Sequence, residues 1–254
     1  MSKSDTPLAL VGYPPTAALA LRELGLIALS VPAAAPEEIV QACRTLGFGG
    51  ALIAPAHQAA WLAAVSPDPE ARRAGRVDAV TFGGLTPQGT FAHADALSDA
   101  LSSSDYAARG AALLVLGQQA GDLLLAAPLT RLGFSQIALA AHSAPEAEKV
   151  LRDLPVGPRY FPVSRRDGSV QALAERSDLI VLTSGELPPR LLQPYHTLLD
   201  LTGQVQAGGS GATVLDLEHL GAHHLTRQLS HATGQRLNAP EVAGAARVLR
   251  GEAG

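Results

Sequence analysis

The chain has 254 residues, of which 47% are hydrophobic and 17% are charged, and its formal net charge is −4. A chain of this length can bury a core without disulfides and is expected to fold as two modest domains. The net charge and the lack of a long basic run argue against nucleic-acid binding, because neutralising phosphates requires clustered lysine and arginine.

The composition also indicates a cellular setting. The opening apolar run is too short for a signal peptide, and no uninterrupted apolar run reaches the roughly 18 residues that a membrane-spanning helix needs. The single cysteine, Cys43, cannot form an internal disulfide and falls within a helical pattern, which favours a buried thiol over a nucleophile. We therefore expect a cytoplasmic protein without a membrane partner.

Strand and helix patterns alternate through the first 60 residues. Apolar runs predict strands over 8–12, 26–31 and 50–54, and helical spacing predicts helices over 15–24 and 37–46. This order favours a parallel sheet with helices on its faces. The polar segment 66–76 is expected to be a loop, followed by a hairpin of 77–82 and 90–93 and a helix over 95–104.

The alternation starts again at residue 111. The run AALLVLG predicts a strand, followed by a long helix that continues to Phe134 despite Pro128. Further strands are expected over 136–140, 160–163, 179–183 and 197–201, with helices beginning near Ala144, Ser169 and Pro188. Residues 204–211 are typical of a linker, and the last helical region, 218–250, is broken near Gly234. This order predicts an α/β protein.

The turn after the strand at 111–117 is a candidate nucleotide-binding loop. A dinucleotide fold needs glycine for the tight turn, for backbone approach to the pyrophosphate and for helix packing. This loop reads Gly117, Gln118, Gln119, Ala120 and Gly121. Gln119 stands where the second glycine is expected; its side chain would occupy pyrophosphate space, or its amide would replace some phosphate contacts. An ordinary doubly wound domain that binds only water or a stray anion remains the alternative.

The segment GFGGALIAPAHQAA (47–60) resembles the GxNVTxPHK loop of shikimate dehydrogenases, with Gln58 in place of the lysine that works on the substrate hydroxyl. His93, Ala94 and Asp95 match the NTD motif, whose aspartate assists that lysine. The resemblance implies catalytic positions at Asp95 and Gln58. Gln58 cannot ionise and so cannot act as an acid or base. Asp95 has an alternative interpretation, as the amino-terminal cap of the helix that follows.

The resemblance also implies positions that contact substrate. The SxS segment that follows the family's first strand is shortened here to the turn at Tyr13, and the AVNT motif appears as Ala79 to Phe82, where Thr81 keeps a hydroxyl. His57 belongs to the loop with Gln58, and Glu241 stands for a glutamine that touches substrate. The acidic side chain disfavours a carboxylate ligand. The predicted substrate-binding residues are Tyr13, His57, Thr81 and Glu241.

Cofactor positions follow in the same way. The family's GAGG loop corresponds to Gly117, Gln118, Gln119 and Ala120, its NRT motif to Ala141, His142 and Ser143, and Thr183 ends a later strand beside them. His142 is mostly neutral at pH 7 and cannot offer the bidentate fork of an arginine. The resemblance therefore implies an NADP or NAD site of weakened affinity. A surface-loop histidine is the alternative for His142.

A metal pair is a further possibility, because His219 and His223 share a helix face, with Glu218 and His224 beside them. Without an identifiable third ligand, a solvated helix face is favoured and no metal is expected.

The resemblance implies a fold of two domains. A substrate-type α/β domain comprises residues 1–104 completed by 234–254, and a Rossmann-like doubly wound parallel sheet of NAD(P)-binding type comprises 105–233. A small-molecule ligand is expected in the interdomain cleft, and a homodimer is left open. Two functions compete: an oxidoreductase with lost or altered activity toward shikimate, and a non-catalytic small-molecule-binding or regulatory module that kept the fold.

Overall fold

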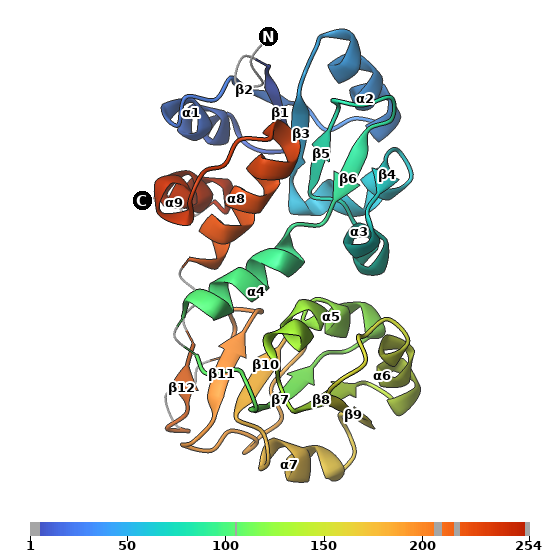
Figure 1. Ribbon diagram of the computed structural model, residues 1–254, viewed down its shortest axis with the longest axis vertical. Helices are drawn as coiled ribbons and strands as arrows, with labels where there is room; N and C mark the ends of the chain where they lie inside the picture. The colour runs from blue at the N-terminus through green and yellow to red at the C-terminus, as the bar shows by residue number, and fades with distance from the viewer. Residues whose placement is uncertain (1–5, 105, 206–209, 216–218, 252–254) are drawn as a thin grey trace. The chain divides into compact units, whose positions relative to one another are not determined.

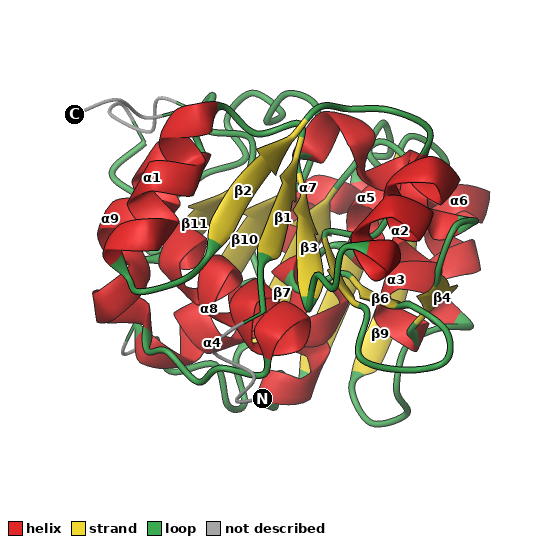
Figure 2. Cartoon of the chain, turned by 90° about the horizontal axis from the view of Figure 1, so that it is seen from above, coloured by secondary structure: helices red, strands yellow, loops and turns green. Residues whose placement is uncertain are grey.

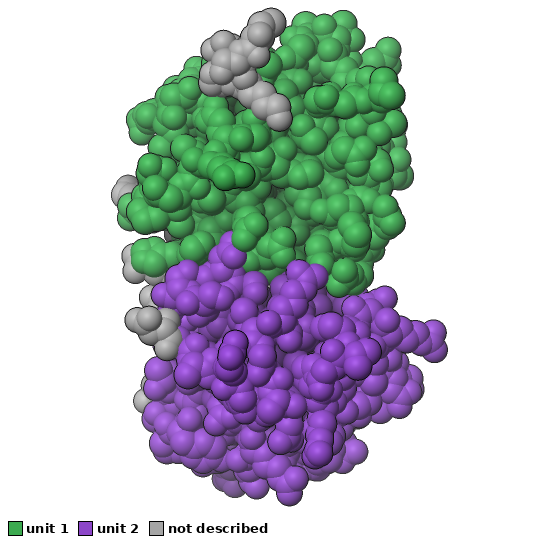
Figure 3. Space-filling model, in the orientation of Figure 1, with its two compact units in different colours: residues 1–96, 218–254 green, residues 97–217 purple. Residues whose placement is uncertain are grey.

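The structure is a computed structural model that describes residues 6–104, 106–205, 210–215 and 219–251. The chain divides into two compact units, which Figure 3 colours separately: residues 1–96 with 218–254, and residues 97–217. Each unit has its own six-stranded sheet. None of the helices among the described residues is long and apolar enough to cross a membrane.

The sheet of the first unit has the order β2-β1-β3-β5-β6-β4 (Figure 1). Its strands are β1 (Leu8–Val11), β2 (Ala28–Val31), β3 (Gly50–Ile53), β4 (Ser66–Pro67), β5 (Ala79–Thr81) and β6 (Gln88–Thr90). β2, β1 and β3 are parallel, as the βαβαβ order predicts, and β5 is antiparallel to both β3 and β6. A mixed sheet results.

Helices cover both faces of this sheet (Figure 2). α1 (Pro15–Glu23), α8 (Leu220–Thr233) and α9 (Ala239–Leu249) pack on one face, and α2 (Pro36–Thr45) covers the other. Leucines of β1 and β3 form a core with Leu225, Leu229 and Val242 of the last two helices. Gly50 permits the close approach of α8, because a Cβ there would collide with the backbone carbonyl of Ala232. Helices α8 and α9 therefore complete the core of the first unit.

The second unit contains an all-parallel sheet of order β12-β11-β10-β7-β8-β9. Its strands are β7 (Ala112–Leu116), β8 (Gln136–Ala141), β9 (Arg159–Ser164), β10 (Leu179–Leu182), β11 (Thr197–Asp200) and β12 (Thr213–Val214). If β7 to β12 are renumbered 1 to 6 and the sheet is read from β9, the order is 3-2-1-4-5-6, which is the doubly wound order. Ligands of such sheets bind at the carboxyl ends of the strands where the order reverses, here between β7 and β10.

Helices lie on both faces of the parallel sheet. α5 (Ala120–Leu124) and α6 (Ala144–Leu151) pack together on one face, where Leu123 and Val150 line the same apolar space as Leu113 and Ile137. α7 (Ser169–Ala174) contributes Val170 and Ala174 to the core on the other face.

Several element predictions were wrong. The long helix after residue 117 is two short pieces, α5 and the 3-10 helix η3 (Ala127–Leu132), because Pro128 has no N–H to continue an α-helical ladder. The helix expected near Pro188 is a turn, in which Arg190 has a φ of 63°. The segment 66–76 is not all loop: Asp68 caps α3 (Pro69–Ala74) by accepting from the Ala71 N–H at 2.7 Å.

The division of the chain differs from the predicted limits in two respects. Helix α8 lies in the predicted 105–233 domain, whereas it packs against β3 and β5 of the first unit. The first boundary falls between residues 96 and 97, within α4 (His93–Ser103), and not after residue 104.

Candidate functional site

The loop between β7 and α5 begins with a glycine that the packing requires. A Cβ on Gly117 would lie 2.9 Å from Thr183 Oγ1, 3.0 Å from Leu123 Cδ2 and 3.1 Å from Asp122 Cβ. The first glycine of the predicted loop is therefore needed for close packing of strand and helix.

The amides that would face a pyrophosphate are already bonded to carboxylates. Asp122 Oδ2 accepts from the backbone N–H of Gln118 at 3.1 Å and of Gln119 at 3.0 Å. The N–H of Ala120 donates to Glu146 Oε2 at 3.3 Å. Two carboxylates, one of them paired with Lys149, thus occupy the amino end of α5, where a dinucleotide fold offers free N–H groups to phosphate.

Ser184, which follows β10, adds hydrogen bonds to the same carboxylate and loop. Ser184 Oγ donates to Asp122 Oδ2 at 2.6 Å and accepts from Gln118 N–H at 2.9 Å. The hydroxyl of Thr183, a predicted cofactor residue, is buried and donates to Leu116 O at 2.9 Å. Thr183 therefore ties β10 to β7, and its position gives it a structural role.

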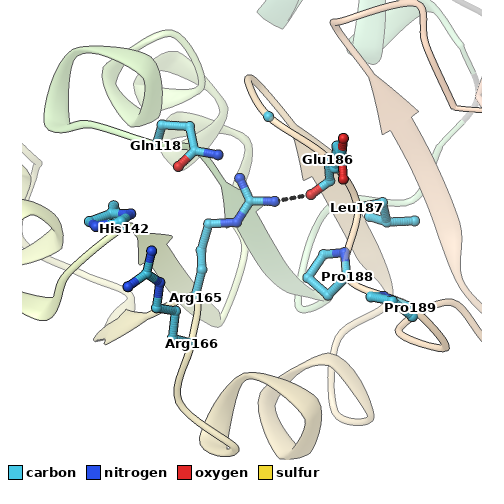
Figure 4. A pocket seen from close by; sticks show the side chains of 9 residues that line it. Gln118, His142, Arg165, Arg166, Glu186, Leu187, Pro188 and Pro189 are labelled. Atoms are coloured by element: carbon cyan, nitrogen blue, oxygen red, sulfur yellow. Dashed lines mark hydrogen bonds between the residues drawn. The ribbon is translucent and has the colours of Figure 1, made fainter.

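A pocket of about 600 Å³ lies at the carboxyl ends of β7 to β10 (Figure 4). It includes the predicted residues Gln118 and His142, and its other lining residues are Arg165, Arg166, Gly185, Glu186, Leu187, Pro188 and Pro189. Ser143, also predicted, precedes the first residue of α6 and makes no side-chain cap there. The pocket occupies the switch point where doubly wound sheets bind ligands.

Arg165 is the polar centre of this pocket, and the sequence prediction missed it. Its Nη1 donates to Ser184 O at 2.8 Å and Gly117 O at 3.3 Å, and its Nη2 donates to Glu186 O. Burial lowers the pKa of this guanidinium. A signal was present in the sequence, because Arg165 and Arg166 follow the strand pattern at 160–163 after one residue, at the edge where ligands bind.

In the first unit, the predicted residues Tyr13, His57 and Gln58 gather at the carboxyl ends of β1 and β3. Ile53 O accepts from Gln58 Nε2 at 3.1 Å and from Tyr13 Oη at 3.4 Å. Gln58 is only 5% exposed. The His57 ring lies against Gly12, so closely that a Cβ at Gly12 would overlap it. The side chain at the family's lysine position therefore faces the protein interior.

A buried aspartate that the sequence prediction missed organises this edge. Asp78 is fully buried, and its carboxylate accepts from Ala92 N–H at 2.9 Å, His93 N–H at 3.3 Å and His224 Nε2 at 2.7 Å. Buried charges require such partners. Gln228 Nε2 donates to the backbone oxygen of the same residue at 3.3 Å. Asp78 thus links β5, the start of α4 and α8.

This network shifts the pKa values of two neighbours. Burial, followed by the nearby His224, lowers the pKa of His93 to about 4. The rings of His93 and His224 meet edge to face, with centroids 5.3 Å apart. Burial and then the charge of Asp78 raise the pKa of Tyr13. His224 keeps 23% of its side chain exposed.

The remaining predicted residues lie apart from this network. Thr81 ends β5 beside Gly49, at the opposite end of β3 from Ile53, because β5 runs antiparallel. Glu241 forms a capping box with Asn238: its carboxylate accepts from the Asn238 N–H at 2.9 Å. Asp95 lies in the first turn of α4, which begins at His93, so the alternative that Asp95 caps this helix was wrong.

A metal site finds no support among the residues that the structure describes, which contain no group of three potential ligands. His219 and His223 lie at the start of α8. Glu218, the third residue considered with them, lies outside the described residues.

By sequence, the chain matches no family model and no curated protein. Its fold is similar to solved structures over nearly their full length. Shikimate 5-dehydrogenase from Listeria monocytogenes, in complex with shikimate and NAD, has 14% identity and a TM-score of 0.75, with 94% of this chain and 95% of that chain covered. Quinate dehydrogenase from Corynebacterium glutamicum, in complex with NAD, has 15% identity and a TM-score of 0.73, with 94% and 98% covered. Shikimate 5-dehydrogenase from Thermus thermophilus, in complex with NADP(H) and shikimate, has 20% identity and a TM-score of 0.71, with 95% and 98% covered.

The chain therefore has the two-domain shikimate dehydrogenase fold, with a mixed sheet and a parallel sheet, and its second unit is of the Rossmann type. This confirms the predicted fold class.

Proposed function

We propose that this protein keeps the shikimate dehydrogenase fold but has lost NAD(P)-linked oxidation of shikimate, and that it acts as a small-molecule-binding module. One observation carries the proposal: the N–H groups of Gln118, Gln119 and Ala120 donate to the carboxylates of Asp122 and Glu146. A pyrophosphate there would lose these donors and meet the negative charge of Asp122, whereas Glu146 is paired with Lys149. The residues present therefore do not fit a dinucleotide bound in the usual way.

The position of Asp122 supports this conclusion. Its carboxylate accepts the N–H groups of both Gln118 and Gln119, so a phosphate placed there would be repelled by that negative charge. Lys149 pairs with Glu146 and offsets the second carboxylate. Weakened NAD or NADP affinity is the expected consequence.

The substrate-type unit supports the same proposal. Gln58 cannot exchange a proton, and its amide is buried against Ile53 O. The only lysines in the sequence are Lys3 and Lys149, and Lys149 pairs with Glu146 in the second unit. Loss of a general acid–base group reduces rates by about 10²- to 10⁴-fold.

Calorimetric titration with NAD and with shikimate tests the proposal. We expect no NAD binding at micromolar concentration. The double variant Asp122→Asn with Glu146→Gln should bind NAD at least about tenfold more tightly than the wild type, because both charges are removed. Glu148→Gln, an exposed change on the same helix as Glu146, is the matched control. Micromolar NAD binding by the wild type would refute the proposal.

A second candidate is an oxidoreductase with altered activity, and one observation favours it. The fully buried Asp78 holds Nε2 of the partly exposed His224 at 2.7 Å, an arrangement in which a carboxylate orients an imidazole for proton transfer. This candidate predicts nicotinamide-dependent turnover of some small hydroxy compound that His224→Gln abolishes. Absence of turnover across a panel of such compounds would remove it.

A further inference from the structure

A groove in the second unit runs along β9, the strand at one edge of the parallel sheet, where α7 packs beside it (Figure 1). Its volume is about 370 Å³. The strand contributes residues 160–163 to its lining, and the helical segment contributes Ser169, Ala172, Leu173 and Arg176. None of these residues lines the pocket of Figure 4. The groove is therefore separate from the candidate nucleotide site.

The helical side of the groove is a single face with polar ends. Ser169, Ala172, Leu173 and Arg176 follow at the spacing i, i+3, i+4 and i+7, which places side chains on one side of a helix. The helical turn continues to Arg176, whose N–H donates to Leu173 O at 3.2 Å. At 1.5 Å per residue, Ser169 and Arg176 are about 10 Å apart along the axis. Apolar surface separates a hydroxyl from a guanidinium.

The hydroxyl at one end lacks a hydrogen-bond partner. Ser169 Oγ is buried, and no described residue bonds to it. Buried polar atoms are normally paired, because an unpaired one loses its hydration without compensation. Since Ser169 lines the groove, a polar group of a bound ligand can supply the missing partner.

The cation at the other end is also unpaired. Arg176 is exposed, and its guanidinium forms no ion pair with any residue that the structure describes. The two acidic side chains nearest in sequence bond elsewhere. Glu175 Oε1 accepts from Gln171 Nε2 at 3.5 Å, and Asp178 Oδ2 accepts from Ala112 N–H at 2.8 Å. An anionic group at this end of the groove would therefore meet an available positive charge.

The strand side of the groove disfavours a peptide as its occupant. The N–H groups of Arg159 and Arg165 donate toward β8, so by the two-residue period of a strand residues 160, 162 and 164 direct their backbone groups to the open edge. Pro162 has no N–H, so a peptide added as a further strand would lack the central donor. A small molecule does not need this donor.

We propose that the groove between β9 and α7 binds an elongated small carboxylic acid. Its carboxylate pairs with Arg176, its apolar body lies against Leu173 and Phe161, and a hydroxyl at its far end bonds to Ser169 Oγ. Phe161 is 36% exposed, and an aromatic ring favours a flat apolar body. The volume and the mainly apolar lining with few polar groups are typical of small-molecule sites.

Calorimetry on the full chain tests the inference with p-coumarate, a flat carboxylic acid with a hydroxyl at the far end of its ring. We expect p-coumarate to bind and p-coumaryl alcohol, which lacks the charge, to bind at least about fivefold more weakly. Arg176→Gln should weaken binding of the acid by the same factor and abolish the difference between acid and alcohol. Arg152→Gln is the matched control, since Arg152 is an exposed arginine of the same unit outside the groove.

Two further variants locate the ligand. Cinnamate, which lacks the hydroxyl, should bind at least about twofold more weakly than p-coumarate, and Ser169→Ala should remove this difference. Ala172→Phe should abolish binding by filling the groove, and it should keep the fold because Ala172 is exposed.

Four results would overturn the inference. They are no binding of p-coumarate at millimolar concentration, equal losses in Arg176→Gln and Arg152→Gln, unchanged binding in Ala172→Phe, and a dimer in sedimentation that Ala172→Phe dissociates, which would show a second copy of the chain on the groove. The inference goes beyond the proposed function and does not depend on it. Micromolar NAD binding refutes the proposed function alone, and failure of p-coumarate refutes only the groove.

Discussion

Removing the carboxylate of Asp78 should destabilise the first unit strongly. This carboxylate is fully buried and accepts three hydrogen bonds, from two backbone N–H groups at the start of α4 and from His224 on α8. Asp78→Ala leaves those donors without an acceptor. Each unsatisfied buried donor costs about 1 to 3 kcal/mol. Since the surrounding segments can relax, we expect a total loss of about 3 to 5 kcal/mol.

The single tryptophan of the chain allows the free energy of unfolding of the first unit to be measured. Trp61 lies in the first unit and is 1% exposed, so its fluorescence during urea unfolding follows that unit even if the two units unfold separately. Glu23→Ala, an exposed acidic position of the same unit, is the control and should change stability by less than about 0.5 kcal/mol.

Two results would refute the reasoning. A loss below about 1 kcal/mol for Asp78→Ala would show that the three hydrogen bonds contribute little. Additive effects of Asp78→Ala and His224→Ala would show that these side chains are not coupled, because residues in one hydrogen-bond network give interaction energies of about 0.5 to 3 kcal/mol.

Three further predictions concern the same unit. The pKa of His93 is lowered to about 4 in the folded protein, against 6.5 for an ordinary histidine, so the unfolded chain binds the proton first as the pH falls. Urea unfolding followed by Trp61 fluorescence should therefore show the free energy of unfolding decreasing between pH 6.5 and about 4, by at most about 3 kcal/mol. His93→Gln should remove this part of the decrease. Gly12→Ala should lower the free energy of unfolding by at least about 1 kcal/mol more than Gly47→Ala. Both glycines have φ near +75°, but only Gly12 lies against the His57 ring. Equal urea midpoints for the two variants would contradict that packing. Gln58→Lys should yield no shikimate-dependent reduction of NADP in an absorbance assay. It should also lower the free energy of unfolding relative to Gln58→Met, since the site is buried. Measurable turnover would show that the rest of the catalytic site is intact.

The arrangement of strands could be predicted because hydrophobic periodicity and glycine punctuation are local signals. The runs at 8–12, 50–54 and 111–117 became β1, β3 and β7 within one or two residues. Helix lengths were less predictable, because the helical spacing continues through Pro128 while the missing N–H interrupts the hydrogen-bond ladder. The proline was visible in the sequence, and its effect was underestimated.

The polar network of the first unit was harder to predict, because its members are distant in the chain. Asp78 and His224 are separated by 146 positions, and no local pattern pairs them. One signal was available: an aspartate within the apolar run Val77 to Val80 is expected to be buried and to need partners. This signal indicates a buried carboxylate, but the identity of its partners depends on the packing of α8.

The carboxylates of Asp122 and Glu146 affect the glycine loop in a different way from the Gln119 side chain. Gln119 in place of glycine predicts only a steric obstacle, whereas Asp122 and Glu146 remove the hydrogen-bond donors themselves. Replacing Gln119 by glycine would leave those donors occupied, so we expect that change alone to leave NAD affinity unaltered. In this chain the loop between β7 and α5 is also tied to β10, because Asp122 accepts from both Gln118 N–H and the Ser184 hydroxyl.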